Sequence, residues 1–112
     1  MAQTVNGIKF VTYIELQKQL NTYIAEHHMY EPNKSGVPLN YTLLQVVECW
    51  ADARRWYFKK TGEKVKEGFH YIKGEGGEHL LSLEGIKLIH KYSGYDGHDA
   101  PMLNEGAELL FQ

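Results

Sequence analysis

The chain has 112 residues, of which 43% are hydrophobic and 23% are charged, proportions typical of a globular domain. This length predicts one domain that buries a core without disulfides, and the composition argues against intrinsic disorder. The formal net charge is −2, and the longest apolar runs fall well short of the roughly 18 residues that a membrane span requires. We therefore expect a single soluble domain with no membrane partner.

The N-terminus and the cysteine content predict a cytoplasmic location. Residues 1–4 lack the basic region and apolar run of a signal peptide. Cys49 is the only cysteine, so no disulfide can form within the chain, which fits a reducing compartment. We expect this thiol to be buried and inert, because no motif for an activating partner surrounds it.

The N-terminal part of the chain predicts an ordered arm followed by an amphipathic helix. The first ten residues, with Asn6-Gly7 among apolar neighbours, predict a short strand or an ordered arm. Thr12 and Glu15 have the spacing of a capping box, and the apolar residues that follow predict a helix over about 13–28.

A second helix is predicted to begin near Thr42, after a stretch rich in proline and glycine. Thr42 and Gln45 have the spacing of a second capping box. Apolar residues continue at helical spacing up to Gly62, so the segment 42–61 is either one long helix or two helices with a turn near Ala51-Asp52. A turn at that point would create a helix-turn-helix.

Beyond Gly68 the pattern changes to the alternation of strands. Residues 69–73 and 79–81 predict a β-hairpin whose tight turn is the glycine-rich segment between them. Ser82 is placed to cap a third helix, which Gly94 is placed to end. The tail that follows is rich in glycine and acidic residues, with at most one short helical turn near 104–110.

These elements together predict an α+β domain with a small β-hairpin. Residues 1–39 form an N-terminal arm and amphipathic helix, 40–93 a winged helix-turn-helix-like core, and 94–112 an acidic tail.

Charge is distributed unevenly along the chain. Residues 54–73 contain seven basic and two acidic residues, whereas 1–53 and 74–112 are both acidic overall. We expect an anionic partner to meet the middle segment, although a solvated helix face explains the same pattern. The candidate nucleic-acid-binding residues are Arg54, Arg55, Lys59, Lys60, Lys64, Lys66 and Lys73.

Several motifs follow one another between residues 43 and 92. They are Val46-Val47-Glu48 through Trp50, Arg54-Arg55-Trp56 with Lys59-Lys60, Glu67-Gly68-Phe69-His70-Tyr71, and Leu80-Leu81-Ser82-Leu83-Glu84-Gly85-Ile86-Lys87. In this order they resemble the AntA-type phage antirepressor domain. The resemblance implies a phage or prophage origin and a role linked to DNA, and with such an origin the protein would act in the cytoplasm of a bacterial host. The family's domain usually stands at the front of a longer chain, whereas residues 1–42 precede it here.

No combination of residues predicts an enzyme, a cofactor or a metal site. Asp96, His98 and Asp99 lie close enough in sequence to hold a divalent metal, but this density of aspartate and glycine is more typical of turns. The glycine-rich segment 74–78 lacks the Lys-Ser/Thr pair of a phosphate-binding loop.

The main prediction is therefore a small phage-type DNA-binding regulatory protein. The alternative is a phage-encoded protein that binds a host or phage protein and inhibits its target without catalysis. That alternative depends on eight tyrosines and two tryptophans, side chains favoured at interfaces, and such a surface also suits a homodimer. The interface candidates, which we expect to be partly exposed, are Tyr30, Tyr41, Tyr92 and Tyr95.

Overall fold

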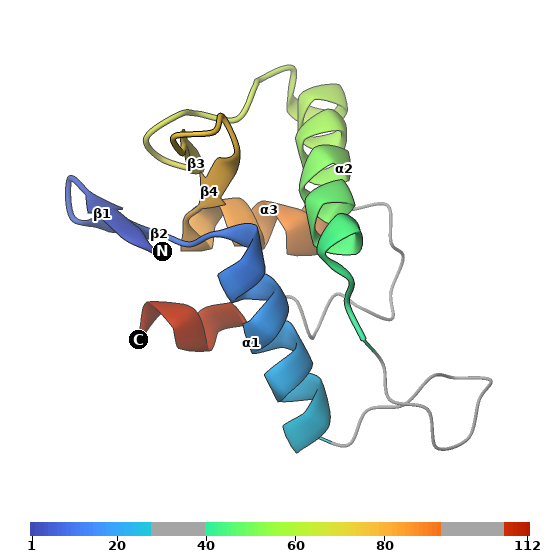
Figure 1. Ribbon diagram of the computed structural model, residues 1–112. Helices are drawn as coiled ribbons and strands as arrows, with labels where there is room; N and C mark the ends of the chain where they lie inside the picture. Colours follow the sequence, from blue (N-terminus) through green and yellow to red (C-terminus); the bar gives the residue numbers. More distant parts are fainter. Residues whose placement is uncertain (28–39, 93–106) are drawn as a thin grey trace.

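The computed structural model describes residues 1–27, 40–92 and 107–112 (Figure 1). This part of the chain forms an α+β fold with three α-helices and two antiparallel hairpins, which confirms the predicted α+β class, whereas the winged helix-turn-helix-like core stays a prediction. The elements are β1 (Gln3–Val5), β2 (Ile8–Phe10), α1 (Tyr13–Glu26), α2 (Leu43–Thr61), β3 (Tyr71–Lys73), β4 (His79–Leu81), α3 (Leu83–Tyr92) and a 3-10 turn, η1 (Leu109–Phe111).

Helix α1 begins at the predicted capping box. The backbone N–H of Glu15 donates to the Thr12 hydroxyl at 3.1 Å, and the Glu15 carboxylate accepts from the Thr12 backbone N–H at 3.0 Å. These two bonds satisfy donors that the first turn of a helix otherwise leaves open. The helix then buries Leu16, Leu20 and Ile24 on one face and ends two residues before the predicted boundary.

Helix α2 begins with the second predicted capping box, in which Thr42 and Gln45 bond each other's backbone N–H. It is one uninterrupted helix of 19 residues, so the alternative with a turn near Ala51-Asp52 does not occur. The segment contains no glycine or proline to break the helix. It ends at Gly62, whose φ of 75° gives the left-handed conformation of a helix C-terminus.

The two hairpins are linked through the strand that leads into α1. Asn6 and Gly7, with φ of 50° and 80°, form the two-residue turn between β1 and β2. The sequence analysis expected only one strand or an arm there. Val11 and Leu81 exchange two backbone hydrogen bonds of 2.8 Å, which join the end of the first hairpin to β4.

The core lies where the three helices and β4 meet. Figure 1 shows α3 lying roughly crosswise to α1 and α2. Trp50 of α2 and Ile86 of α3 are fully buried at this junction. Ala107, at the start of the last helical turn, is also fully buried, so the short turn predicted in the tail is confirmed for its described residues.

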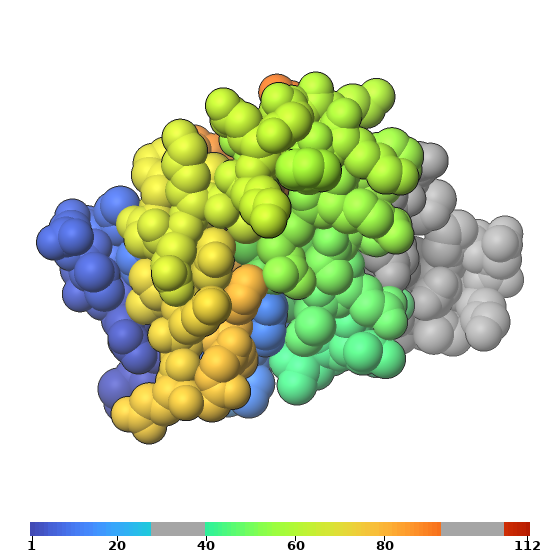
Figure 2. Space-filling model, turned by 90° about the horizontal axis from the view of Figure 1, so that it is seen from above, coloured from blue at the N-terminus to red at the C-terminus, as the bar shows by residue number. Residues whose placement is uncertain are grey.

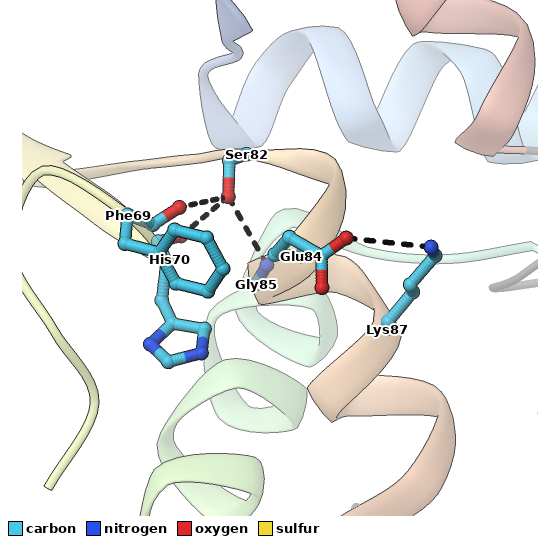
Figure 3. Close-up of polar contacts among 6 residues, drawn as sticks. All are labelled: Phe69, His70, Ser82, Glu84, Gly85 and Lys87. Atoms are coloured by element: carbon cyan, nitrogen blue, oxygen red, sulfur yellow. Dashed lines mark hydrogen bonds and ion pairs between the residues drawn. The ribbon is translucent and has the colours of Figure 1, made fainter. Parts of the chain in front are cut away.

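Ser82 connects the β3–β4 hairpin region to α3 (Figure 3). Its hydroxyl accepts from the backbone N–H of Gly85 at 3.2 Å, which confirms the predicted helix cap. The same hydroxyl donates to the carbonyl oxygen of Phe69 at 2.6 Å and lies 3.2 Å from that of His70. The predicted end of this helix at Gly94 lies outside the described residues.

None of the helices in the described ranges has the length and apolar character needed to cross a membrane.

Candidate nucleic-acid interface

The seven candidate basic residues lie on three consecutive segments of the chain. Four are in the second half of α2, two are in the connection 62–70, and Lys73 is in β3. Figure 2 shows the end of α2, this connection and the β3–β4 hairpin side by side on one surface of the molecule. We call this surface the basic face.

The two arginines of α2 have different surroundings, although they are neighbours in sequence. Successive helical residues differ by about 100° in direction. Arg55 is therefore turned to solvent, with 61% of its side chain exposed, and it pairs with Asp52 at 2.7 Å. Arg54 faces the hairpin together with Phe58, one turn later.

The lysines at the end of α2 have a structural role as well as their charge. Lys59 and Lys60 lie in the last turn, where positive charge is favourable beside the negative end of the helix dipole. The ammonium of Lys59 also lies 4.9 Å from the ring centroid of Trp56, within reach of a cation–π interaction. Arg55 and Lys59 are both exposed and lie one turn apart on the helix.

A cavity of about 250 Å³ lies between α2, the connection and the β3–β4 hairpin. We call it the α2–hairpin cavity. Its lining residues are Arg54, Phe58, Lys64, Val65, Tyr71 and His79. The structure therefore brings together two of the predicted basic residues, Arg54 and Lys64, from different elements. The sequence analysis did not single out the other four, because only the pairing of hairpin and helix makes them neighbours.

Arg54 contributes a cation that no carboxylate of the described residues neutralises. Its guanidinium carbon lies 5.6 Å from the ring centroid of Trp50. In the described ranges Arg54 forms no ion pair, and its buried Nε has no hydrogen-bond partner. Buried polar groups of native proteins usually have a partner, so this side chain has unused capacity to donate.

His79 closes the cavity as a neutral ring. The Nε1 of Trp50 can only donate, and it lies 2.8 Å from Nδ1 of His79, which must accept. Burial lowers the pKa of His79, and the nearby charges of Arg54 and Lys73 lower it further. The proton of the neutral ring therefore sits on Nε2. The ring also stacks on Tyr71 at a centroid distance of 4.2 Å.

His70 is a second buried histidine that the sequence analysis did not single out as functional. The backbone N–H of Lys66 donates to its Nδ1 at 2.9 Å, which closes a turn within the connection just before β3. Burial lowers the pKa of His70, followed by the positive charge of Lys66. Tyr57 packs edge-on against the ring at 5.7 Å. The contacts of His70 with Lys66 and Tyr57 therefore fix the connection next to α2, within the basic face.

The expected partial exposure of Tyr41 is wrong. Only 5% of this residue is exposed, and it belongs to the core. Its backbone N–H donates to the Asn21 side chain at 2.8 Å, and its carbonyl accepts from Gln17 and Asn21 of α1. These bonds between distant parts of the chain draw Tyr41 inward.

Of the other tyrosine and metal candidates, the structure describes only Tyr92. Tyr92 is partly exposed and packs edge-on against Tyr57. Tyr30, Tyr95 and the segment 94–101, with Asp96, His98 and Asp99, lie outside the described residues. Within the described ranges no group of three or more metal-ligating side chains comes together. Cys49 is buried, as expected.

A second concave surface lies near the N-terminus. This apolar groove of about 410 Å³ is lined by Met1, Thr12, Tyr13, Ile14, Glu15, Leu43 and Glu78. Ile14 is 55% exposed, and Leu44, close by on α2, is 65% exposed. The sequence analysis did not identify this groove, because it lies between segments that are distant in sequence.

Comparison with protein-family models, curated proteins and solved structures gave no match for this chain. The likeness of residues 43–92 to antirepressor domains stays a prediction that depends on the quoted motifs. The function must be inferred from the side chains themselves.

Proposed function

We propose that this chain is a small DNA-binding regulatory protein that holds the phosphate backbone against the basic face. The observation that carries this proposal is the excess of cations between 54 and 73, seven basic against two acidic residues, on three consecutive segments that lie side by side on one surface (Figure 2). Phosphate contacts from lysine and arginine supply most of the affinity of such proteins. In this proposal the β3–β4 hairpin serves as a wing beside α2.

Helix α2 provides the contacts that approach DNA most directly. Arg55 and Lys59 lie one turn apart on its exposed side, a spacing that lets both reach neighbouring phosphates. Arg55 also has the planar donor group that reads a guanine edge in the major groove. Its pairing with Asp52 holds the side chain extended along the helix and has to be exchanged for a phosphate on binding.

The acidic balance of the rest of the chain supports binding in one orientation. Residues 82–112, which follow the hairpin, contain five acidic and two basic residues, and the whole chain is slightly acidic. Surfaces outside the basic face are therefore poor partners for a polyanion. This arrangement favours a defined docking geometry over non-specific coating of DNA.

The test is the salt dependence of binding to a labelled DNA duplex, measured by fluorescence anisotropy. Replacing Arg55 and Lys59 together by alanine is expected to weaken binding and to flatten the slope of log affinity against log salt by about one to two units, because each phosphate contact contributes about 0.9. The control removes the same charge elsewhere, at the exposed Lys18 of α1 and Lys87 of α3. Equal losses in both double variants would refute the basic face as the binding surface.

The apolar groove supports a second candidate function, inhibition of a host protein. Exposed Met1, Ile14 and Leu44 at or beside it form the kind of apolar surface that protein interfaces bury. A partner retained from a host lysate after nuclease treatment, and lost on replacing Ile14 by serine, would favour this function. A partner list that disappears after nuclease treatment would favour DNA binding.

A further inference from the structure

We infer that the α2–hairpin cavity binds a nucleoside 5′-phosphate unit, with the phosphate on Arg54 and Lys64 and the base against the aromatic rings. This inference rests on the proposed function and specifies it, because it adds an unpaired nucleotide to the contacts with the duplex backbone. The same chemistry occurs in a free nucleotide and in the unpaired end of a strand. The cavity is distinct from the exposed side of α2 that carries Arg55 and Lys59.

The cations of the cavity match a phosphate group. Arg54 and Lys64 come from α2 and from the connection after it, so they meet a ligand from two directions. Arg54 forms no ion pair in the described ranges, and its Nε has no partner there. An arginine without an ion-pair partner can bind phosphate through its charge and its several N–H donors, without first releasing a carboxylate. Neutral His79 adds the N–H on Nε2 as a donor without a further charge.

The rings of the cavity match a nucleobase. Phe58 is 50% exposed beside the two cations, so its ring is accessible to a base. Tyr71 and His79 form a stacked pair on the hairpin side, at a centroid distance of 4.2 Å. Sequence-tolerant binding of single-stranded nucleic acid combines such stacking surfaces with a positively charged groove.

The size and rigidity of the cavity point to one nucleotide. Its volume of about 250 Å³ exceeds the needs of a phosphate group and lies just below the range of pockets for drug-sized ligands. The hydrogen bond from Trp50 to His79, one of the lining residues, attaches the hairpin to α2 beside the cavity. The ligand therefore meets rings that are already in place, which reduces the ordering cost of binding.

The first experiment follows backbone amide shifts of the full chain by NMR during addition of thymidine 5′-monophosphate, thymidine or inorganic phosphate. The monophosphate is expected to shift the amides of Lys64, Val65, Tyr71 and His79, with weaker effects from the other two probes. Equal responses to the monophosphate and inorganic phosphate would overturn the role of the rings. No saturable response of these amides to the monophosphate would overturn the cavity as a site.

The second experiment compares Phe58→Ala with Phe69→Ala, which removes a similarly exposed ring, 44% exposed, outside the cavity. Phe58→Ala is expected to lower the affinity for a single-stranded oligothymidine by about 5- to 150-fold, the effect of losing one base stack. Phe69→Ala is expected to leave that affinity unchanged. Equal affinities of the two variants would overturn the inference.

The two proposals fail in different ways. Phe58→Ala keeps every charge, so its affinity for a duplex and the salt slope are expected to match those of the parent chain. Duplex binding with the expected slope, but without any effect of Phe58→Ala on oligothymidine, overturns the cavity and leaves the basic face. No duplex binding, with thymidine monophosphate still shifting the cavity amides, refutes the DNA-binding function and supports a site for a free nucleotide.

Discussion

Trp50 joins the core to the α2–hairpin cavity, and its replacement tests both. The side chain is fully buried, lies 6.2 Å from the ring of Tyr71 and donates from Nε1 to His79 at 2.8 Å. Trp50→Ala removes the whole ring and is expected to lower the free energy of unfolding by about 3–5 kcal/mol, the usual effect of truncating a large buried aromatic. A domain of this kind is stable by only about 5–15 kcal/mol.

Trp50→Phe separates the hydrogen bond from the packing. The smaller ring still fills most of the site, but Nδ1 of His79 loses its donor in a partly buried position. An unsatisfied buried acceptor costs about 1–3 kcal/mol. We therefore expect Trp50→Phe to lower the free energy of unfolding by a substantial fraction of the decrease caused by Trp50→Ala. The loss comes from the missing hydrogen bond as well as from the smaller side-chain volume.

The assay is urea unfolding at neutral pH followed by far-ultraviolet circular dichroism, with the m-value compared between variants. The control is Trp56→Ala, which removes a partly exposed tryptophan from the same helix. It is expected to cost clearly less than Trp50→Ala. A Trp50→Ala variant as stable as the parent chain would refute the placement of Trp50 in the core and, with it, the hydrogen bond that holds His79 at the cavity.

Three further predictions test other parts of the structure. Gly85→Ala places a Cβ against the carbonyl oxygen of His70, which also accepts a hydrogen bond from Ser82. Overpacking and the weakened hydrogen bond should lower the free energy of unfolding by about 2–4 kcal/mol, despite the higher helix propensity of alanine. Urea unfolding that shows a stabilised variant would contradict this close approach. Burial lowers the pKa values of His70 and His79 below 6.5, so the unfolded chain binds more protons than the folded one and the free energy of unfolding should fall as the pH drops below about 6.5; equal urea midpoints at about pH 7 and pH 5.5 would contradict this linkage. Asp52→Asn removes the partner of an exposed arginine, so anisotropy should show tighter DNA binding, and unchanged affinity would mean that this arginine contacts no phosphate.

The helices could be predicted from sequence because their signals are local. Thr12 with Glu15 and Thr42 with Gln45 each place a capping box within four residues, and both boxes form as expected. The continuity of α2 was the point left open. Hydrophobic spacing does not distinguish one long helix from two. The continuity of α2 follows from burial on both sides of Ala51, at Trp50 and Ala53, and from the lack of a breaker near Ala51.

Two features were missed for different physical reasons. Asn6-Gly7 carries one of the strongest local signals for a hairpin, but the strands on either side have three residues each and show little alternation. The burial of Tyr41 has no local signal, because it depends on hydrogen bonds to Asn21, 20 residues earlier. A local pattern can be read from one segment, whereas a contact between segments requires their relative placement.

The candidate site shows the same division. The charge of residues 54–73 was visible in the sequence, but the separate roles of Arg54 and Arg55 were not. Adjacent residues on a helix differ by about 100° in direction, so one arginine faces the hairpin and the other faces solvent. The contact of Trp50 with His79 spans 29 residues and has no sequence signature.

The two kinds of basic residue in this chain suit two parts of one binding event. The side chains of Arg55 and Lys59 are long and exposed. Such side chains supply salt-dependent affinity for nucleic acid, but they adapt to many phosphate geometries and so discriminate little. The cavity is framed instead by His79, held by Trp50, and by rings on a hairpin that Ser82 fastens to α3. A rigid frame discriminates between ligands, because a mismatched ligand leaves its polar groups unpaired. Under the proposed function, the exposed cations would bring nucleic acid to the surface, and the cavity would hold an unpaired nucleotide there.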